Sequence, residues 1–223
     1  MLLDAMGTLV RLDDPVGRLR AALESHTGAD VGSDGAARAL RAEIAYYRAH
    51  LHTAVDPPSL ALLRAACAEA MRPALPEPVA SAEPERLLAA LMEGIAFAAY
   101  ADAAPALRAL RALGLRLVVV SNWDVSLHER LAETGLAPLV DGAVASAEIG
   151  VAKPDPAIFR HALELAGGVP AAAALHAGDS LDADVEGARA AGLRAVLVAR
   201  GDGPAPAGVA SISSLAELPA LLA

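Results

Sequence analysis

The chain has 223 residues, of which 55% are hydrophobic and only 3% aromatic, so its core has to be built from aliphatic side chains. A globular chain of this length buries roughly 70–75% of its unfolded surface, enough for one large domain or two modest ones. The net charge of −9, with no clustered basic face, argues against nucleic acid as a partner. No apolar stretch reaches membrane-spanning length, so we expect no membrane partner.

Cys67 is the single cysteine, which excludes an internal disulfide and fits a reducing cytoplasm. The first residues lack a basic segment followed by a long apolar one, so a standard secretion signal is not expected. We therefore expect a cytoplasmic protein in which Cys67 is a small buried side chain on a helix. The composition does not indicate an oligomeric state.

Met1 to Leu3 predict a short first strand that ends directly before Asp4. Three residues are few for a central strand, and an upstream start codon would lengthen it. From Pro15 to about Ala99 the pattern is helical, with breaks expected at residues 28–35, 56–58 and 73–84. In the second of these helices one face is expected to be apolar (Ala37, Leu40, Ile44, Tyr47 and Leu51) and the other solvated (Arg38, Arg41, Glu43 and Arg48).

After about Ala103, short apolar runs alternate with helix-length amphipathic segments. The expected strands are 117–120, 143–145, 173–176 and 195–198, and the expected helices are 125–134, 156–166 and 185–191. Such alternation predicts a parallel sheet, which the first strand has to join. We therefore predict an α/β protein with a Rossmann-like, doubly wound parallel sheet core (residues 1–12 and 103–223) and an inserted all-helical cap domain (residues 13–102).

Polar side chains follow four of the expected strands. They are Asp4 with Thr8, Ser121 with Asn122, Lys153, and Asp179 with Asp184. In a doubly wound sheet, ligands bind outside the carboxyl ends of the strands. Each cluster alone is explained by a helix cap, a turn or a surface position, but the four in order favour one shared site.

The residue types in these clusters suit phosphoryl transfer. Asp4 can attack phosphorus and form an aspartyl-phosphate. Asp179, with Asp184 as a secondary ligand, can bind Mg²⁺ through hard oxygen atoms, and the main-chain carbonyl of Met6 can add another.

The remaining polar residues can bind the transferring oxygens. Ser121, Asn122 and Lys153 are the expected hydrogen-bond donors to a phosphoryl group. Lys153 is the single lysine beside 17 arginines, and its charge would let Asp4 approach an anion.

These motifs resemble the haloacid dehalogenase-like hydrolase superfamily, in the branch with a helical cap inserted after the first motif. The family's first motif, Asp-x-Asp-x-Thr, corresponds to residues 4–8, and its second, a Ser or Thr, to Ser121. Its third, a lysine, corresponds to Lys153, and its fourth, an acidic pair, to Asp179 and Asp184. The resemblance covers about residues 1–12 and 100–223, whereas the cap matches in length and helicity only.

The resemblance implies a Mg²⁺-dependent phosphatase acting on a small-molecule substrate, a phosphate ester or an acyl phosphate. Asp4, Thr8, Ser121 and Lys153 would be its catalytic residues, with Ser121, Asn122 and Lys153 binding substrate. The metal would be held by Asp4, Asp179, Asp184 and the backbone carbonyl of Met6.

Met6 departs from the family pattern. In the family's phosphatases the second aspartate of the first motif protonates the leaving alkoxide and later helps water attack the phosphoenzyme, which a methionine cannot do. General acid–base help is worth about 10²–10⁴-fold. A good leaving group would compensate, or another acid, for which the candidates are Asp124, His128, His50, His52 and Tyr47. Arg48 is a further candidate for binding a substrate anion, although a solvated helix face is the simpler interpretation.

Two other functions stay open. The family's metal-independent 2-haloacid dehalogenases also lack the second aspartate, but their fourth loop typically reads Ser-x-Asn, whereas this chain has Gly178-Asp179. The second open function is that of a binding or scaffold protein, derived from a hydrolase whose catalytic activity is weakened. Phosphonate-cleaving relatives use a lysine of the cap for their chemistry. The single lysine of this chain, Lys153, lies outside the expected cap, so we exclude that reaction.

Overall fold

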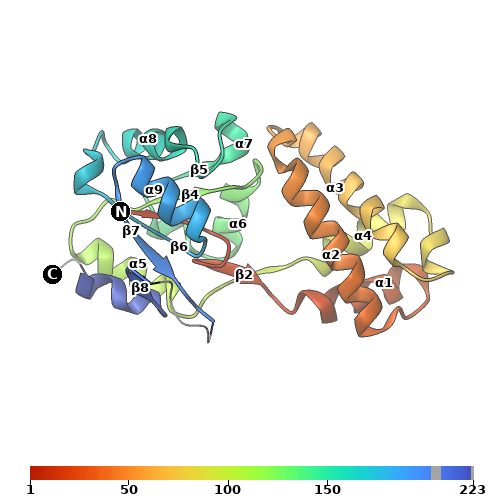
Figure 1. Cartoon of the computed structure of the whole chain (residues 1–223). Coiled ribbons are helices and arrows are strands. Elements are labelled where there is room, and N and C mark those ends of the chain that lie inside the picture. The colour runs from red at the N-terminus through yellow and green to blue at the C-terminus, as the bar shows by residue number, and fades with distance from the viewer. Residues whose placement is uncertain (202–206, 222–223) are drawn as a thin grey trace. The chain divides into compact units, whose positions relative to one another are not determined.

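The computed structural model describes residues 1–201 and 207–221 (Figure 1). They form two compact units. One comprises Met1–Arg11 and the chain from Ala98 onward, and the other comprises Leu12–Phe97.

The first unit is built on a six-stranded sheet with the order β5-β4-β1-β6-β7-β8, in which every neighbouring pair is parallel. The strands are β1 (Leu2–Leu3), β4 (Val118–Ser121), β5 (Gly142–Ala145), β6 (Leu175–Gly178), β7 (Arg194–Val198) and β8 (Ser211–Ile212). The two-residue strand β1 lies between β4 and β6, with Leu3 paired to Val119 on one side and Ala177 on the other. The residue that follows β1 therefore emerges at the centre of the sheet's carboxyl edge.

Helices flank this sheet on both faces (Figure 1). The α-helices are α5 (Ala103–Ala112), α6 (Leu127–Glu133), α7 (Ser146–Ile149), α8 (Pro156–Leu165) and α9 (Gly187–Ala190). The shorter turns are η4 (Ala137–Leu139), η5 (Ala171–Ala173), the π-helical η6 (Leu181–Glu186) and η7 (Leu215–Leu221). Helices α8 and α9 lie on one side of the sheet and α5, packed against η7, on the other. The predicted doubly wound α/β fold is confirmed.

The core between the sheet and α8 is aliphatic, as the composition predicts. Leu2, Val118, Val120 and Val144 from the strands pack with Ile158 and Phe159, the one large aromatic ring in this cluster. Alternate residues of each strand face this side, which is the ordinary period of a pleated strand. The buried face fixes the register of β1 although it is only two residues long.

The second unit is helical. Its helices are α1 (Pro15–Thr27), α2 (Gly32–His50), α3 (Pro57–Met71) and α4 (Pro84–Gly94), with short turns η1 (Leu51–Thr53), η2 (Arg72–Ala74) and η3 (Val79–Ser81). Helix α1 packs against α2 and α4, and α2 packs against α3. Asp14 and Asp56 cap α1 and α3, each with a proline in the first turn. Among the described residues, no helix combines the length and the apolar character needed to cross a membrane.

Several element boundaries differ from the expected ones. Helix α2 begins at Gly32, inside a segment expected to be a break, because Gly35 and Ala36 are buried there and packing outweighs the helix cost of glycine. Strand β6 begins two residues late because Ala171–Ala173 form a turn. The short strands β2 (Val10–Leu12) and β3 (Phe97–Ala99) pair with each other and were not predicted, since each has only three residues.

The position of Glu43 shows that the polarity predicted for α2 was wrong. Its buried residues are Gly35, Ala36, Ala39, Leu40 and Glu43, so the buried stripe runs one position away from the expected one. Glu43 was expected on the solvated face and is only 5% exposed. Burial raises its pKa to about 7, partly opposed by a hydrogen bond from the thiol of Cys67. Cys67, on α3, is buried as predicted.

We predict that Glu43→Gln stabilises the protein at pH 8 and changes little at pH 5. Folded Glu43 holds its proton up to about pH 7, whereas the unfolded side chain loses it near pH 4.5, so the native state binds more protons between these values. Wild-type stability therefore falls as the pH rises through this window, by up to about 3 kcal/mol, and glutamine removes the loss. Urea unfolding at both pH values measures it.

The control for this prediction is Glu24→Gln, because Glu24 is exposed on α1. It should change the free energy of unfolding by less than about 0.5 kcal/mol at either pH. If Glu43→Gln shifts stability equally at pH 5 and pH 8, the proposed ionisation of Glu43 is wrong.

Candidate active site

The site lies at the carboxyl edge of the sheet, around Asp4. Asp4 directly follows β1 and donates its backbone N–H to the carbonyl of Ala177 in β6, at 2.9 Å. Ser121 is the last residue of β4, and Asp179 follows the last residue of β6. Because β4 and β6 flank β1, the topology places Asp4 between the ends of its two neighbours.

Lys153 lies between Asp4 and Asp184, in the loop that precedes α8. Its Nζ is 2.6 Å from Oδ1 of Asp4 and 2.5 Å from Oδ1 of Asp184, and all three side chains are buried. Burial alone lowers the pKa of Lys153, but the two carboxylates outweigh it and raise the pKa above its usual value. Lys153 is therefore a buried ammonium paired with two acids.

Asn122 fixes the backbone of Lys153. Its amide nitrogen donates to the carbonyl of Lys153 at 2.9 Å, and its Oδ1 accepts the N–H of Lys153 at 2.7 Å. Asn122 stays a predicted phosphoryl-binding residue. In the structure its side chain holds the lysine loop against the end of β4.

Ser121 holds the other side of the Asp4 carboxylate. Its hydroxyl donates to Oδ1 of Asp4 at 3.0 Å, so this oxygen accepts hydrogen bonds from both Ser121 and Lys153. Within the described part of the chain, Oδ2 of Asp4 accepts no hydrogen bond. One carboxylate oxygen is thus anchored, and the other is left to react.

Residues 7 and 8 form the turn beneath this carboxylate. Gly7 has φ of 79°, and a Cβ there would overlap the carboxylate of Asp179, so glycine is required for two reasons. The hydroxyl of Thr8 is buried without a hydrogen-bond partner among the described residues. A buried hydroxyl without a partner costs stability, which fits a group that binds a ligand.

The carboxylates fit a divalent cation. Asp4, Asp179 and Asp184 can each offer an oxygen, and these oxygens lie within 4.8 Å of one another. Burial, followed by the charges of Asp4 and Asp184, raises the pKa of Asp179 to about 6. The positive charge of Lys153 opposes this effect and lowers the pKa of Asp179 in part. Hard carboxylate oxygens suit Mg²⁺, whose charge would relieve the repulsion.

Asp184 is the most constrained of the three acids. Its Oδ1 accepts hydrogen bonds from Lys153 and from His176 (2.8 Å), and its Oδ2 accepts the N–H of Ser180 at 2.9 Å. Burial raises the pKa of Asp184, but the hydrogen bond from His176 and the charge of Lys153 outweigh it and hold the pKa well below its usual range. These contacts favour a role in orienting Lys153 over a role as a main metal ligand.

His176 is a buried residue of this network that the sequence interpretation treated only as part of a strand. It lies in β6 and is fully buried. The available signal is a histidine between Leu175 and Ala177, in an otherwise apolar strand that ends directly before Asp179.

Several candidates for a replacement acid have structural contacts of their own. Asp124 is buried and accepts the N–H of Ser126 at 2.6 Å, at the start of α6. His128 is exposed and pairs with Glu148. Tyr47, Arg48, His50 and His52 lie in the helical unit, where Nδ1 of His50 is 2.8 Å from the carbonyl oxygen of Tyr46.

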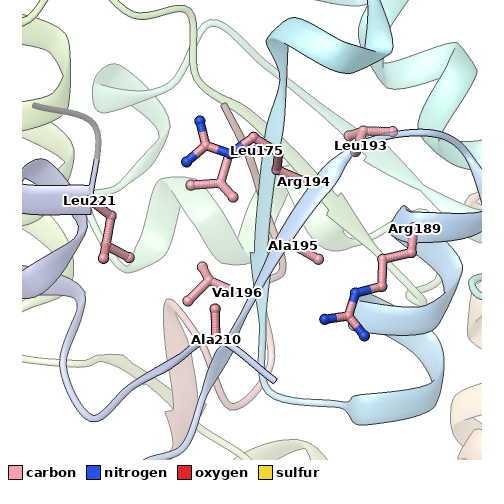
Figure 2. A pocket seen from close by; sticks show the side chains of 8 residues that line it. All are labelled: Leu175, Arg189, Leu193, Arg194, Ala195, Val196, Ala210 and Leu221. Atoms are coloured by element: carbon pink, nitrogen blue, oxygen red, sulfur yellow. The ribbon is translucent and has the colours of Figure 1, made fainter. Parts of the chain in front are cut away.

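Figure 2 shows a cavity of about 300 Å³ elsewhere in the first unit. Leu175, Arg194 and Val196 line it from the first halves of β6 and β7, and Arg189 of α9 points toward it. The candidate carboxylates follow the opposite, carboxyl ends of the strands. This cavity is therefore separate from the site around Asp4.

A carboxylate oxygen that accepts no hydrogen bond from the described residues, a buried ammonium and three acids that could hold a metal ion lie together at the edge of a parallel sheet. This arrangement suits nucleophilic attack by an aspartate. The sequence model of the haloacid dehalogenase-like hydrolases matches residues 1–192. The chain belongs to this family, as its motifs predict.

Two curated relatives illustrate the match. Haloacid dehalogenase-like hydrolase domain-containing protein 3 of Bos taurus is 47% identical over 100 residues, which are 45% of this chain and 38% of that protein. Phosphoserine phosphatase of Thermus thermophilus is 43% identical over 103 residues, 46% of this chain and 41% of that protein. The chain thus spans about two fifths of the length of these relatives.

Two solved structures cover nearly the whole chain. A phosphatase of the family from Thermococcus onnurineus is 26% identical with a TM-score of 0.65, and covers 99% of this chain and 96% of its own. A 2-haloacid dehalogenase from Pseudomonas syringae is 25% identical with a TM-score of 0.63, over the same shares of the two chains. The fold is therefore common to both reaction types.

We predict that Gly178→Ala destabilises the protein by about 1–3 kcal/mol, because the added Cβ would overlap the buried carboxylate of Asp184. Gly178 does not have a positive φ, so the effect would come from the overlap and not from backbone strain. Urea unfolding followed by circular dichroism measures it. Gly201→Ala is the matched control, because a Cβ there meets none of the described residues within 4 Å. Equal stability of the two variants would contradict the tight packing of Asp184.

Proposed function

We propose that this chain is a Mg²⁺-dependent phosphatase that acts on a small phosphorylated metabolite through a phosphorylated Asp4. The observation that carries the proposal is the carboxylate of Asp4, whose Oδ1 is held by Ser121 and Lys153 while Oδ2 accepts no hydrogen bond from the described residues. The phosphatases among the relatives of the chain support it.

In the first step Oδ2 of Asp4 attacks phosphorus, and the bond from phosphorus to the leaving oxygen breaks with its electron pair. Lys153 and Ser121 keep the nucleophile in place, and the ammonium offsets the repulsion between Asp4 and the phosphoryl oxygens. The free hydroxyl of Thr8 is a further donor to this group. In the second step water attacks phosphorus and releases Asp4 and phosphate.

Asp4, Asp179 and the backbone carbonyl of Met6 would hold the Mg²⁺ ion, with Asp184 as a secondary ligand. When bound, the ion neutralises charge on the carboxylates and on the phosphoryl oxygens. Residues 1–12 and 103–223 would then be the catalytic core, and residues 13–102 the cap that selects the substrate. The lone, buried Cys67 supports a cytoplasmic location.

Met6 narrows the substrate class. Its thioether cannot protonate a leaving alkoxide, so departure depends on the leaving group itself. An acyl phosphate releases a carboxylate, which is stable without a proton, whereas an alkyl phosphate releases an alkoxide. We therefore propose an acyl phosphate, or an ester with an equally good leaving group, as the better substrate.

We predict that Mg²⁺-dependent release of phosphate from acetyl phosphate or p-nitrophenyl phosphate falls by at least about 10³-fold in Asp4→Asn, because the nucleophile is lost. Phosphate release with and without EDTA measures it. Asp182→Asn is the matched control, because Asp182 is an exposed acid of η6, three residues after Asp179, and should retain activity. Full activity of Asp4→Asn would contradict the proposed nucleophile.

We predict that Met6→Asp speeds hydrolysis of alkyl phosphates by up to about 10²-fold and that of acetyl phosphate by less, because only an alkoxide needs the added acid to leave, whereas help to the attacking water is common to both substrates. Met6→Asn serves as the control for polarity without acidity. Steady-state kcat on both substrates measures the difference. If Met6→Asp gives no gain on any alkyl phosphate, the proposed phosphatase chemistry at position 6 is wrong.

The runner-up function is a metal-independent 2-haloacid dehalogenase, which the missing second aspartate and the Pseudomonas syringae structure favour. Halide release from 2-chloropropionate, unaffected by EDTA, would establish it in place of the phosphatase. Failure of both assays across a broad panel of metabolites would favour a weakened hydrolase that serves as a binding or scaffold protein.

A further inference from the structure

His176 is the fully buried polar side chain of strand β6. Its Nε2 is 2.8 Å from Oδ1 of Asp184, and its ring meets the ring of Phe159 edge-on, with centroids 5.1 Å apart. Its Nδ1 has no hydrogen-bond partner among the described residues. The ring is therefore fixed by one hydrogen bond on one side and by packing on the other.

The proton of a neutral His176 has to lie on Nε2. A carboxylate oxygen only accepts hydrogen bonds, so the ring nitrogen that faces Asp184 has to donate. Nδ1 is then the unprotonated atom, which fits its apolar surroundings. Burial lowers the pKa of His176, in keeping with a neutral ring.

His176 donates to the same oxygen of Asp184 that receives the ammonium of Lys153. The second oxygen of Asp184 accepts the backbone N–H of Ser180. The carboxylate is thus held at both oxygens before Lys153 contacts it. Without the histidine, only the N–H of Ser180 and the ammonium of Lys153 would oppose rotation of the Asp184 carboxylate about its Cβ–Cγ bond. Lys153 is the group that this carboxylate has to hold in place.

We infer that His176 is a positioning residue, which fixes Asp184 so that the ammonium of Lys153 stays beside Oδ1 of Asp4. An apolar side chain would fill the same space between β6 and α8 without leaving a buried nitrogen unpaired, so packing alone does not account for a histidine here. The kinetic part of this inference rests on the proposed phosphatase function, whereas the geometric part does not.

The kinetic test compares His176→Leu with His176→Gln in the full chain. Leucine fills the space and removes the donor, whereas the amide nitrogen of glutamine reaches the position of Nε2. We expect His176→Leu to lower kcat for acetyl phosphate by about 10–100-fold, with KM changed less than about 3-fold, and His176→Gln to recover most of the loss. His161→Leu, at an exposed position of α8, is the control. Equal kcat in wild type and His176→Leu would overturn the inference.

The second test needs no activity, because Lys153 is the single lysine of the chain. Protein labelled with ¹⁵N-lysine gives one Nζ signal, which reports the Lys153 ammonium alone. We expect this signal to be protected from solvent exchange in wild type and His176→Gln, and to shift or broaden in His176→Leu. Thermal unfolding of the three proteins shows that each is folded.

The two tests separate the inference from the proposed function. If wild type releases no phosphate but the Nζ signal changes in His176→Leu alone, the phosphatase proposal fails and the positioning role stands. If the Nζ signal is the same in wild type and in a folded His176→Leu, the positioning role fails, whatever the activity.

Discussion

The ammonium of Lys153, buried between the carboxylates of Asp4 and Asp184, is the interaction on which the site depends. The partners are 149 and 31 residues away in the sequence, so only the folded sheet brings them together. Each charge loses hydration on burial, and removing one partner would leave an unpaired charge in the protein interior. The central place of β1, the loop before α8 and the end of β6 must therefore all be correct at once.

Backbone groups help to hold these charges in place. Asn122 holds both backbone polar groups of Lys153, and the N–H of Ser180 holds Asp184. At positions 7 and 178 the carboxylates of Asp179 and Asp184 lie where any side chain would have its Cβ. Bare backbone lets acids approach more closely than packed side chains would, which explains how several carboxylates share a site of this size.

The fold and the meeting of four loops could be predicted, because both follow from strand–helix alternation and from the rule that parallel strands end at one edge. The partners of single side chains could not. The contacts of Asn122 with the backbone of Lys153 have no signature in the sequence, and Glu43 is buried because the apolar stripe of α2 is rotated by one position. An alanine-rich helix gives a weak periodic signal, since alanine fits both faces. The hydrogen bond of His176 to Asp184 was not predicted, because the pattern of a strand indicates which residues are buried and not which ones form hydrogen bonds.

The backbone and the side chain of residue 6 contribute to the site in different ways. Its backbone bridges to Val10, and the N–H of the next residue, Gly7, donates to the carbonyl of Val10 at 2.9 Å, so the turn that carries the position 6 carbonyl forms whatever side chain is present. The side chain adds neither an acid nor another negative charge to a site in which the pKa values of Asp4 and Asp179 are already raised. On the proposed function, a methionine in place of a carboxylate removes proton transfer and leaves the proposed nucleophile Asp4, its lysine and the oxygen ligands in place. Such a site would favour displacement of a group that leaves without a proton.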